Sequence, residues 1–394
     1  MSTLRIAVVG TGGRAQAHLS TIKKLHDLYT LCGVCDGDTT RADENGAKWG
    51  ATSYTDVRSL LDGEKPDVVF IVVPPDAHHV IATLSAQAGT HVITETPIAT
   101  TLGMADLMMD ACIQHGVKLE VSENVWRWPH ERLKRMIVDA GVIGDVTHAR
   151  LWYASGSYHG FNAVRTLVRS EAARVLGYDG EVAVPAYVDG AGKRITGQDW
   201  ESGVIEFESG TTCLYEFPPR GHRSSLWEIE GTEGQLVGRE VHLYDGDNRV
   251  THTIEDVVGE VDGRPTLDAV KLSAPGVGRA DIEWVNPYRQ YGTRDMDDIS
   301  RAQILGGMHA AVTNGSEPEY GATNGRRDQE LCIGVRESAM RDSGWVDVPL
   351  TGSLLHEDRQ HEAFRSRYGH DPSEVDALAN VMFPRTGVRR TTGV

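Results

Sequence analysis

The chain has 394 residues, of which 40% are hydrophobic, and its formal net charge at pH 7 is −17. A chain of this length can bury a substantial core and is expected to form about two domains. The acidic balance, without a dense run of lysine and arginine, argues against nucleic acid and against an anionic membrane surface as partners. Since no apolar stretch reaches spanning length and the N-terminus has no signal-peptide pattern, we expect a cytoplasmic protein that binds a small molecule.

The first third of the chain alternates apolar runs with amphipathic segments. Runs such as 4–10 and 67–74 have no polar face, which is typical of strands buried on both sides of a parallel sheet. The segments between them, such as 14–27 and 78–88, place apolar residues three and four apart and predict helices. The repeated order of strand and helix predicts a doubly wound α/β domain over residues 1–125.

The first predicted strand ends in GTGGRA, residues 10–15, which matches a dinucleotide-binding fingerprint. Gly10 permits the tight turn, Gly12 lets the backbone approach a pyrophosphate, and Ala15 allows close packing of helix on strand. Asp36 ends the second predicted strand and is suited to bind the adenosine ribose hydroxyls, which favours NAD over NADP. The residues expected to bind NAD are Gly10, Gly12, Gly13, Arg14, Ala15, Asp36, Pro74, His78, Glu95, Thr96, Pro97 and Asn124.

After about residue 145 the pattern changes to alternating apolar and polar residues with glycine-rich turns. This pattern predicts a mostly antiparallel sheet with one face solvated or in an interface. Two long helical patterns follow, at about 295–314 and 325–342. We therefore expect a second domain over residues 126–350, followed by a polar arm, residues 351–394, that needs another surface to order it.

Several motifs occur in a characteristic order: GTGGRA, PPDAHH, AGTHVITETPIA, ENVWRWP, GVIGDV, GTEGQLV and ESAMRDSGWVDVPL. In order and spacing they make the chain resemble the glucose–fructose oxidoreductase/inositol dehydrogenase/MocA (Gfo/Idh/MocA) family. The resemblance implies a Rossmann domain followed by an α+β domain with an open, mostly antiparallel sheet. It also implies that nicotinamide and substrate meet in the cleft between the domains, and that the chain assembles as a homo-oligomer, a dimer or a tetramer.

The chain departs from this family at two places that handle protons. Ordinary members carry a Glu-Lys-Pro tripeptide whose lysine assists proton transfer, whereas this chain has Glu95-Thr96-Pro97. Where ordinary dehydrogenases have an aspartate and, four residues later, a histidine, this chain has Ala163 and Leu167. Three hypotheses follow: an NAD-dependent glycosidase like the lysine-less branches of the family, a net sugar or polyol dehydrogenase with a relocated base, and a non-catalytic NAD-binding sensor.

The glycosidase hypothesis is the one that we prefer from the sequence. In it a ring hydroxyl, at C3, is transiently oxidised, the aglycone leaves by elimination, water adds, and the ketone is reduced again. His159 suits proton exchange at neutral pH, and Tyr158 precedes it at the start of the second domain. The predicted catalytic residues are His159, Tyr158, Tyr291 and His222.

Aromatic and arginine side chains provide candidates for holding the sugar. Aromatic faces are natural platforms for sugar rings, and arginines bind anionic groups. The predicted substrate-binding residues are Trp126, Arg127, Trp128, Arg165, Arg169 and Arg220. Arg165 and Arg169 lie four apart, so a helix would place them on one face, and this supply of arginine suggests an acidic glycoside such as a sulfoquinovoside or a uronide. No group of residues has the spacing of metal ligands, so no metal is expected.

Overall fold

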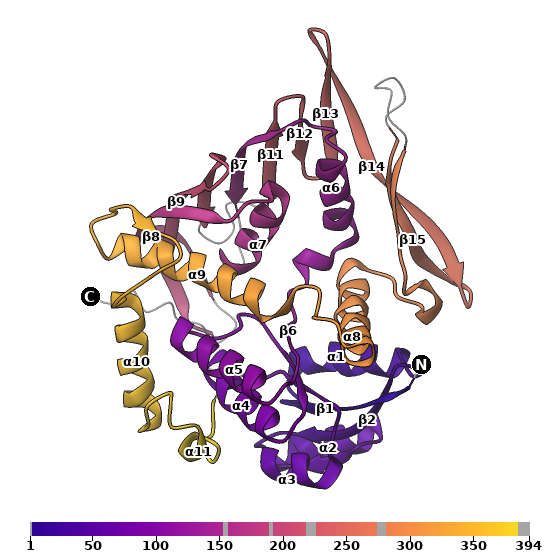
Figure 1. Cartoon of the computed structure of the whole chain (residues 1–394), viewed down its shortest axis with the longest axis vertical. Helices are drawn as coiled ribbons and strands as arrows, with labels where there is room; N and C mark the ends of the chain where they lie inside the picture. Colours follow the sequence, from indigo (N-terminus) through magenta and orange to yellow (C-terminus); the bar gives the residue numbers. More distant parts are fainter. Residues whose placement is uncertain (1, 153–156, 189–191, 218–225, 274–280, 385–394) are drawn as a thin grey trace.

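The computed structural model describes residues 2–152, 157–188, 192–217, 226–273 and 281–384 (Figure 1). Its first sheet has six strands in the order β3-β2-β1-β4-β5-β6, and all neighbours pair in parallel. The strands are β1 (Leu4–Val9), β2 (Tyr29–Cys35), β3 (Thr52–Tyr54), β4 (Val68–Ile71), β5 (His91–Thr94) and β6 (Leu119–Val121). This sheet confirms the doubly wound arrangement predicted from the uniformly apolar runs.

Helices alternate with these strands: α1 (Gly13–Lys24), α2 (Thr39–Trp49), α3 (Val57–Glu64), α4 (His78–Gln87) and α5 (Leu102–Gln114), with short 3₁₀ turns η1 (Pro75–Ala77) and η2 (Val125–Arg127). Side-chain caps define several helix starts, because Asp38, Asp56 and Thr101 each accept a hydrogen bond from the backbone N–H three residues on. In contrast, α1 begins without a side-chain cap. Its first backbone N–H groups are therefore available to an anion.

The second sheet has eleven strands in the order β16-β15-β14-β13-β12-β11-β7-β10-β9-β8-β17. It is antiparallel except where β7 and β10 pair in parallel. Its strands are β7 (Val146–Trp152), β8 (Ala172–Val188), β9 (Arg194–Phe207), β10 (Thr212–Phe217), β11 (Leu226–Gly231), β12 (Gly234–Val237), β13 (Glu240–Asp245), β14 (Asn248–Val261), β15 (Arg264–Leu272), β16 (Ile282–Val285) and β17 (Val346–Asp347). The predicted combination of a Rossmann sheet and a large, mostly antiparallel sheet is thus confirmed.

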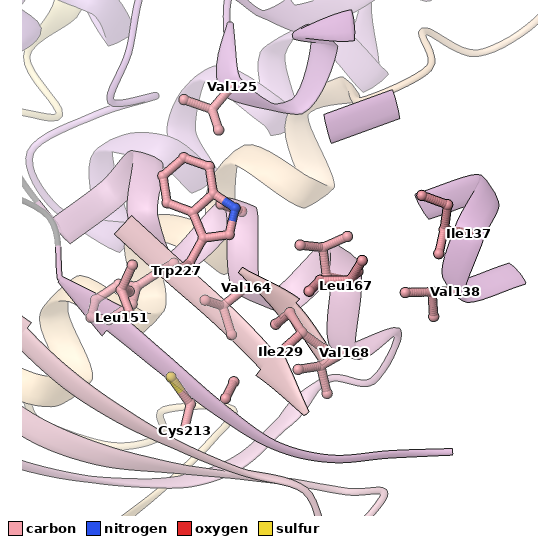
Figure 2. Packing of buried hydrophobic residues seen from close by; sticks show 14 of the residues in the cluster. Val125, Ile137, Val138, Leu151, Val164, Leu167, Val168, Cys213, Trp227 and Ile229 are labelled. Carbon is pink, nitrogen blue, oxygen red and sulfur yellow. The ribbon is translucent and has the colours of Figure 1, made fainter. Parts of the chain in front are cut away.

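One face of the second sheet is covered by helices, which are α6 (Pro129–Asp139), α7 (Ser157–Val168) and α9 (Gly321–Ala339). Figure 2 shows Val164, Leu167 and Val168 of α7 packed with Leu151 and Ile229 of the sheet. Ala163 is buried in the same cluster. Ala163 and Leu167, which the resemblance matched to an aspartate and a histidine of ordinary dehydrogenases, are thus core side chains in this protein.

The two sheets are joined through α8 (Met296–Asn314), which packs on α1, and through α9, which contacts both β6 and β8 (Figure 1). A short 3₁₀ turn, η3 (Arg289–Tyr291), precedes α8. The chain then returns to the first domain as α10 (Leu355–Tyr368) and α11 (Val375–Leu378), and α11 contacts α4. In the described part of the chain, no helix has the length and apolar character needed to cross a membrane.

Candidate functional site

The loop between β1 and α1 has the shape that a dinucleotide requires. Gly10 has φ of 89°, and a Cβ built on it would lie only 2.2 Å from the carbonyl oxygen of Val72. A Cβ on Gly12 or Gly13 would meet no atom within 4 Å, so the space beside the uncapped start of α1 is open. These residues fit a pyrophosphate at a helix N-terminus, as the fingerprint predicts.

Asp36 connects the end of β2 to this loop. Its Oδ2 accepts hydrogen bonds from the backbone N–H and the hydroxyl of Thr11, each at 2.9 Å. The guanidinium of Arg41 lies 3.3 Å from its Oδ1. A carboxylate at this position accepts hydrogen bonds from ribose hydroxyls and repels a 2′-phosphate, so this acceptor fits NAD.

Glu95, at the end of β5, is tied to α1 by two side chains. Its Oε1 accepts from Nε2 of His18 at 2.5 Å and from Nε of Arg14 at 2.8 Å. Burial of Glu95 raises its pKa, but the hydrogen bonds and charges of His18 and Arg14 outweigh that effect and hold the pKa well below its usual range. Glu95 is therefore an anion that fixes the loop carrying Thr96 and Pro97 against α1. The peptide bond between Thr96 and Pro97 is cis.

His78 supports this loop from behind. The ring is fully buried, with Nδ1 3.1 Å from the carbonyl oxygen of Pro97 and Nε2 3.0 Å from that of Val73. Burial lowers its pKa. The structure thus places His78 between the loops that follow β4 and β5 rather than on an exposed wall of the cleft, and Pro74 lies in the first of these loops, immediately before η1.

A histidine–carboxylate pair lies opposite the Glu95 loop. Nδ1 of His159, in the first turn of α7, lies 2.8 and 2.9 Å from the two carboxylate oxygens of Glu123. Burial lowers the pKa of His159, but the charge and hydrogen bond of Glu123 outweigh it, so the pKa lies above its ordinary value. The charges of Glu95 and Arg14 also act on His159, so these groups lie close enough to interact. The His159 side chain remains 27% exposed, whereas that of Glu123 is fully buried.

Asp297, in the first turn of α8, forms a further acidic group of this cleft. Its Oδ1 accepts from Nδ2 of Asn124 and from Nε1 of Trp128, each at 2.8 Å. Its charge also acts on Arg14. The cleft is therefore lined from α1, from the loops after β5 and β6, and from the starts of α7 and α8.

The three residues of the Trp126–Trp128 segment have different surroundings. Arg127 is fully buried and pairs with Glu120 at 2.7 Å, so its predicted role in binding the sugar directly is wrong: its guanidinium has no exposed face. Trp128 packs on Trp227, with ring centroids 6.3 Å apart. The ring of Trp126 lies beneath the guanidinium of Arg135, at 4.2 Å.

Tyr158 and Arg165 both point from α7 toward α9. The hydroxyl of Tyr158 donates to the carbonyl oxygen of Gly325 at 3.2 Å, and burial raises its pKa well above the usual value. Nε of Arg165 donates to Asp328 at 2.8 Å, and its other nitrogens donate to Glu171 and Asn324. The Tyr158 ring meets the ring of His159 edge to face, with centroids 5.9 Å apart, but the Tyr158 hydroxyl and the Arg165 guanidinium have internal partners of their own.

The predicted two-arginine clamp is also wrong. Helix α7 ends at Val168, and Arg169 follows it with φ of 59°, so it does not continue the helical face of Arg165. Its side chain is 57% exposed and pairs with Asp139 at 2.7 Å. One arginine is therefore internal and the other lies on the surface.

Three predicted site residues remain. Tyr291 lies away from the cleft, and His222 and Arg220 lie in a segment that the structure does not describe. The hydroxyl of Tyr291 donates to Asp27 at 2.9 Å, beyond the C-terminal end of α1. The cleft is at the other end of that helix, and a helix of 12 residues is about 18 Å long. His222 and Arg220 lie outside the described residues, as does the rest of the segment 218–225.

Sequence reasoning missed Glu123, Asp297 and His18 as parts of the site. Glu123 had a signal, since it follows a strand of a parallel sheet, and the carboxyl edge of such a sheet borders the ligand. Asp297 had none, because its helix comes from the far end of the second domain. Among the described residues there is no group of three or more His, Cys, Asp or Glu placed to hold a metal ion.

Comparison with known proteins agrees with this geometry. Residues 4–123 match the GFO_IDH_MocA family model, described as an oxidoreductase family with an NAD-binding Rossmann fold. A D-apiose dehydrogenase of Paraburkholderia graminis is 29% identical over 271 residues, which cover 62% of this chain and 71% of that protein. A levoglucosan dehydrogenase of Pseudarthrobacter phenanthrenivorans is 27% identical over 89% of this chain and 99% of its own length.

Solved structures share the fold over nearly the same span. A levoglucosan dehydrogenase in complex with NADH and levoglucosan superposes with a TM-score of 0.69, covering 89% of this chain and all of that one at 20% identity. The prediction that the first domain binds NAD is confirmed by the family match and by the loop that the structure shows.

Proposed function

Since the chain belongs, through its NAD-binding domain, to the Gfo/Idh/MocA oxidoreductase family, we propose that it is a net NAD-dependent dehydrogenase acting on a secondary hydroxyl of a sugar or sugar derivative. The names of the relatives support a sugar, because they include a D-apiose and a levoglucosan dehydrogenase. The observation that carries the proposal is the pair of His159 and Glu123 in the cleft with Arg14 and Glu95.

The residues that hold the cofactor are those of the glycine loop together with Asp36. When bound, NAD accepts a hydride from the carbinol carbon during oxidation. The backbone N–H groups at Gly12 and Gly13 bind the pyrophosphate, and Asp36 holds the adenosine ribose. Glu95, fixed by Arg14 and His18, keeps the Thr96–Pro97 loop at the nicotinamide end.

His159 takes the hydroxyl proton as the carbonyl forms. Glu123 accepts the hydrogen on Nδ1, and this tautomer carries its basic lone pair on Nε2. The buried carboxylate also stabilises the imidazolium that results. The pair is therefore positioned to accept one proton from the substrate hydroxyl. This arrangement supplies the base that Thr96 cannot provide.

A redox-neutral glycosidase needs a second proton-transfer group for the carbon next to the ketone. Of the predicted proton-transfer groups, Tyr158 donates to Gly325. Tyr291, predicted at the leaving group, donates to Asp27, and His222 lies outside the described residues. The two relatives named above are dehydrogenases. Net oxidation is therefore the function that these observations favour over glycoside hydrolysis.

The test is a panel of sugars and of glycosides with chromogenic aglycones, assayed with stoichiometric and with catalytic NAD⁺. We expect one NADH for each sugar oxidised, lost in His159→Asn and kept in His26→Asn, a matched variant at an exposed histidine beyond the end of α1. Release of aglycone with catalytic NAD⁺ and no net NADH would establish the glycosidase instead.

A further inference from the structure

The C-terminal arm crosses the first domain on the side where the loops after β4 and β2 emerge. The hydroxyl of Tyr368 donates to Asp76, in the loop after β4, at 2.6 Å, and the guanidinium of Arg367 lies 3.3 Å from the same oxygen. Further along the arm, the carbonyl oxygen of Pro372 lies 3.0 Å from Nε2 of His79. The arm is therefore attached to the start of α4.

The arm then reaches the end of β2. A Cβ built on Gly37 would lie 2.5 Å from Sδ and 2.7 Å from Cε of Met382, so this methionine rests on the backbone of Gly37. Gly37 directly follows Asp36, the residue placed to bind the adenosine ribose. A Cβ at position 37 would push the flexible end of the methionine away from the backbone.

The positions of the two loops define what the arm spans. In the sheet, β1 lies between β2 and β4, so the loops after β2 and β4 flank the glycine loop that follows β1. A dinucleotide lies outside the carboxyl ends of these strands, with its adenosine on the β2 side. The arm thus contacts the loops on both sides of the glycine loop, at the end of the site where the adenosine would lie.

Met382 is 65% exposed although its neighbours in the arm are packed. Phe383 packs against Tyr368 with the rings tilted and their centroids 4.8 Å apart, and both join the apolar cluster under α4. The backbone on either side of the methionine is thereby anchored, while its thioether is open beside Asp36. Thioethers pack well on aromatic faces, and adenine is a planar aromatic ring.

We propose that the C-terminal arm is part of the cofactor site and that Met382 covers the adenine ring of bound NAD. The apolar contact and the exclusion of water from one face of the ring strengthen cofactor binding. The anchor of Tyr368 on Asp76 positions the arm for this contact. This inference rests on NAD binding and not on the sugar chemistry proposed above.

The test measures cofactor affinity without any sugar. Dissociation constants for NAD⁺ and for ADP-ribose are determined by calorimetry for the full-length protein, for Met382→Ala, and for a chain ending at Asn380. We expect Met382→Ala to raise both constants about fivefold, which is the effect of losing part of one buried methionine contact, and the shortened chain to raise them at least as much.

The matched control is Met136→Ala, which removes another partly exposed methionine, from α6 of the second domain. It should leave both dissociation constants unchanged. Wild-type affinity for NAD⁺ in both Met382→Ala and the shortened chain would overturn the proposal. So would a loss in the shortened chain accompanied by a lower unfolding temperature, if Met382→Ala had no effect. Either result leaves the dehydrogenase proposal standing, because no sugar takes part.

Discussion

Nδ1 of His159 lies 2.8 Å from Oε2 of Glu123, although the two residues come from different domains. Glu123 follows the last strand of the parallel sheet, and His159 begins the first helix that covers the antiparallel sheet. The pair therefore forms only when the domains are packed together. Because the carboxylate of Glu123 is fully buried, its charge acts on the histidine with little screening by solvent.

Replacement of His159 by asparagine should remove the base while leaving the cofactor loop intact. We expect kcat for sugar oxidation to fall by about 10²- to 10⁴-fold, the range for loss of a general base. The dissociation constant for NAD⁺, measured by calorimetry, should stay within about twofold of wild type, since His159 lies outside the glycine loop. Comparable losses in kcat and in NAD⁺ affinity would show that His159 supports the cofactor rather than the proton transfer.

Replacement of Asp36 by serine should shift cofactor preference toward NADP⁺. The carboxylate that repels a 2′-phosphate is removed, and Arg41, now 3.3 Å from that carboxylate, becomes available to the phosphate. The ratio of kcat/KM for NADP⁺ to that for NAD⁺ should rise by at least about tenfold, which is the effect expected of one charged contact with the 2′-phosphate. Arg41→Ala in the same background should cancel the gain; an unchanged ratio in Asp36→Ser would disprove the assignment of Asp36.

Arg165 and Arg169 should differ in their effects on stability. Arg165→Ala leaves the fully buried Asp328 without its ion-pair partner and should lower the free energy of unfolding by about 3–5 kcal/mol. Arg169→Ala removes a surface ion pair with Asp139 and should change it by less than about 1 kcal/mol. Denaturant unfolding of both variants measures this contrast. Neither substitution should raise KM for an acidic sugar more than for a neutral one, and a selective rise would restore the clamp hypothesis.

Thr96→Lys tests whether the base has moved away from the loop after Glu95. A lysine there would bring a positive charge toward Arg14 and His159 without replacing the pair of His159 and Glu123. The double variant Thr96→Lys with His159→Asn should therefore remain at least about 10²-fold below wild type in kcat. Recovery to wild-type turnover would mean that the loop position can carry the proton transfer by itself.

The NAD-binding half of the site was predictable because its residues are contiguous in sequence and their roles are set by backbone geometry. Gly10 must adopt a positive φ, and Asp36 must end the second strand, so both leave a local pattern. Thr96 has an equally local pattern, since its position in the tripeptide predicts where the nicotinamide end lies.

The second half of the site depended on side-chain directions that no local pattern encodes. Tyr158 and His159 are adjacent, yet the tyrosine turns toward Gly325 and the histidine toward Glu123. Helix periodicity placed Arg165 and Arg169 on one face, but α7 ends between them. Asp297 enters from a helix more than 170 residues after Asn124, the residue that it binds. Only the packing of the two domains decides these contacts.

The most direct test of the central claim is the pH dependence of kcat/KM for sugar oxidation at saturating NAD⁺, in wild type and in Glu123→Gln. Oxidation needs neutral His159, so the wild-type rate should rise with pH through a pKa above the ordinary histidine value, because Glu123 raises it. In Glu123→Gln the charge that raises this pKa is removed while burial still lowers it, so the rise should move to lower pH and the plateau should fall about 10- to 100-fold. An identical inflection in both proteins, or no rise near neutrality, would contradict the assignment of His159 as the base.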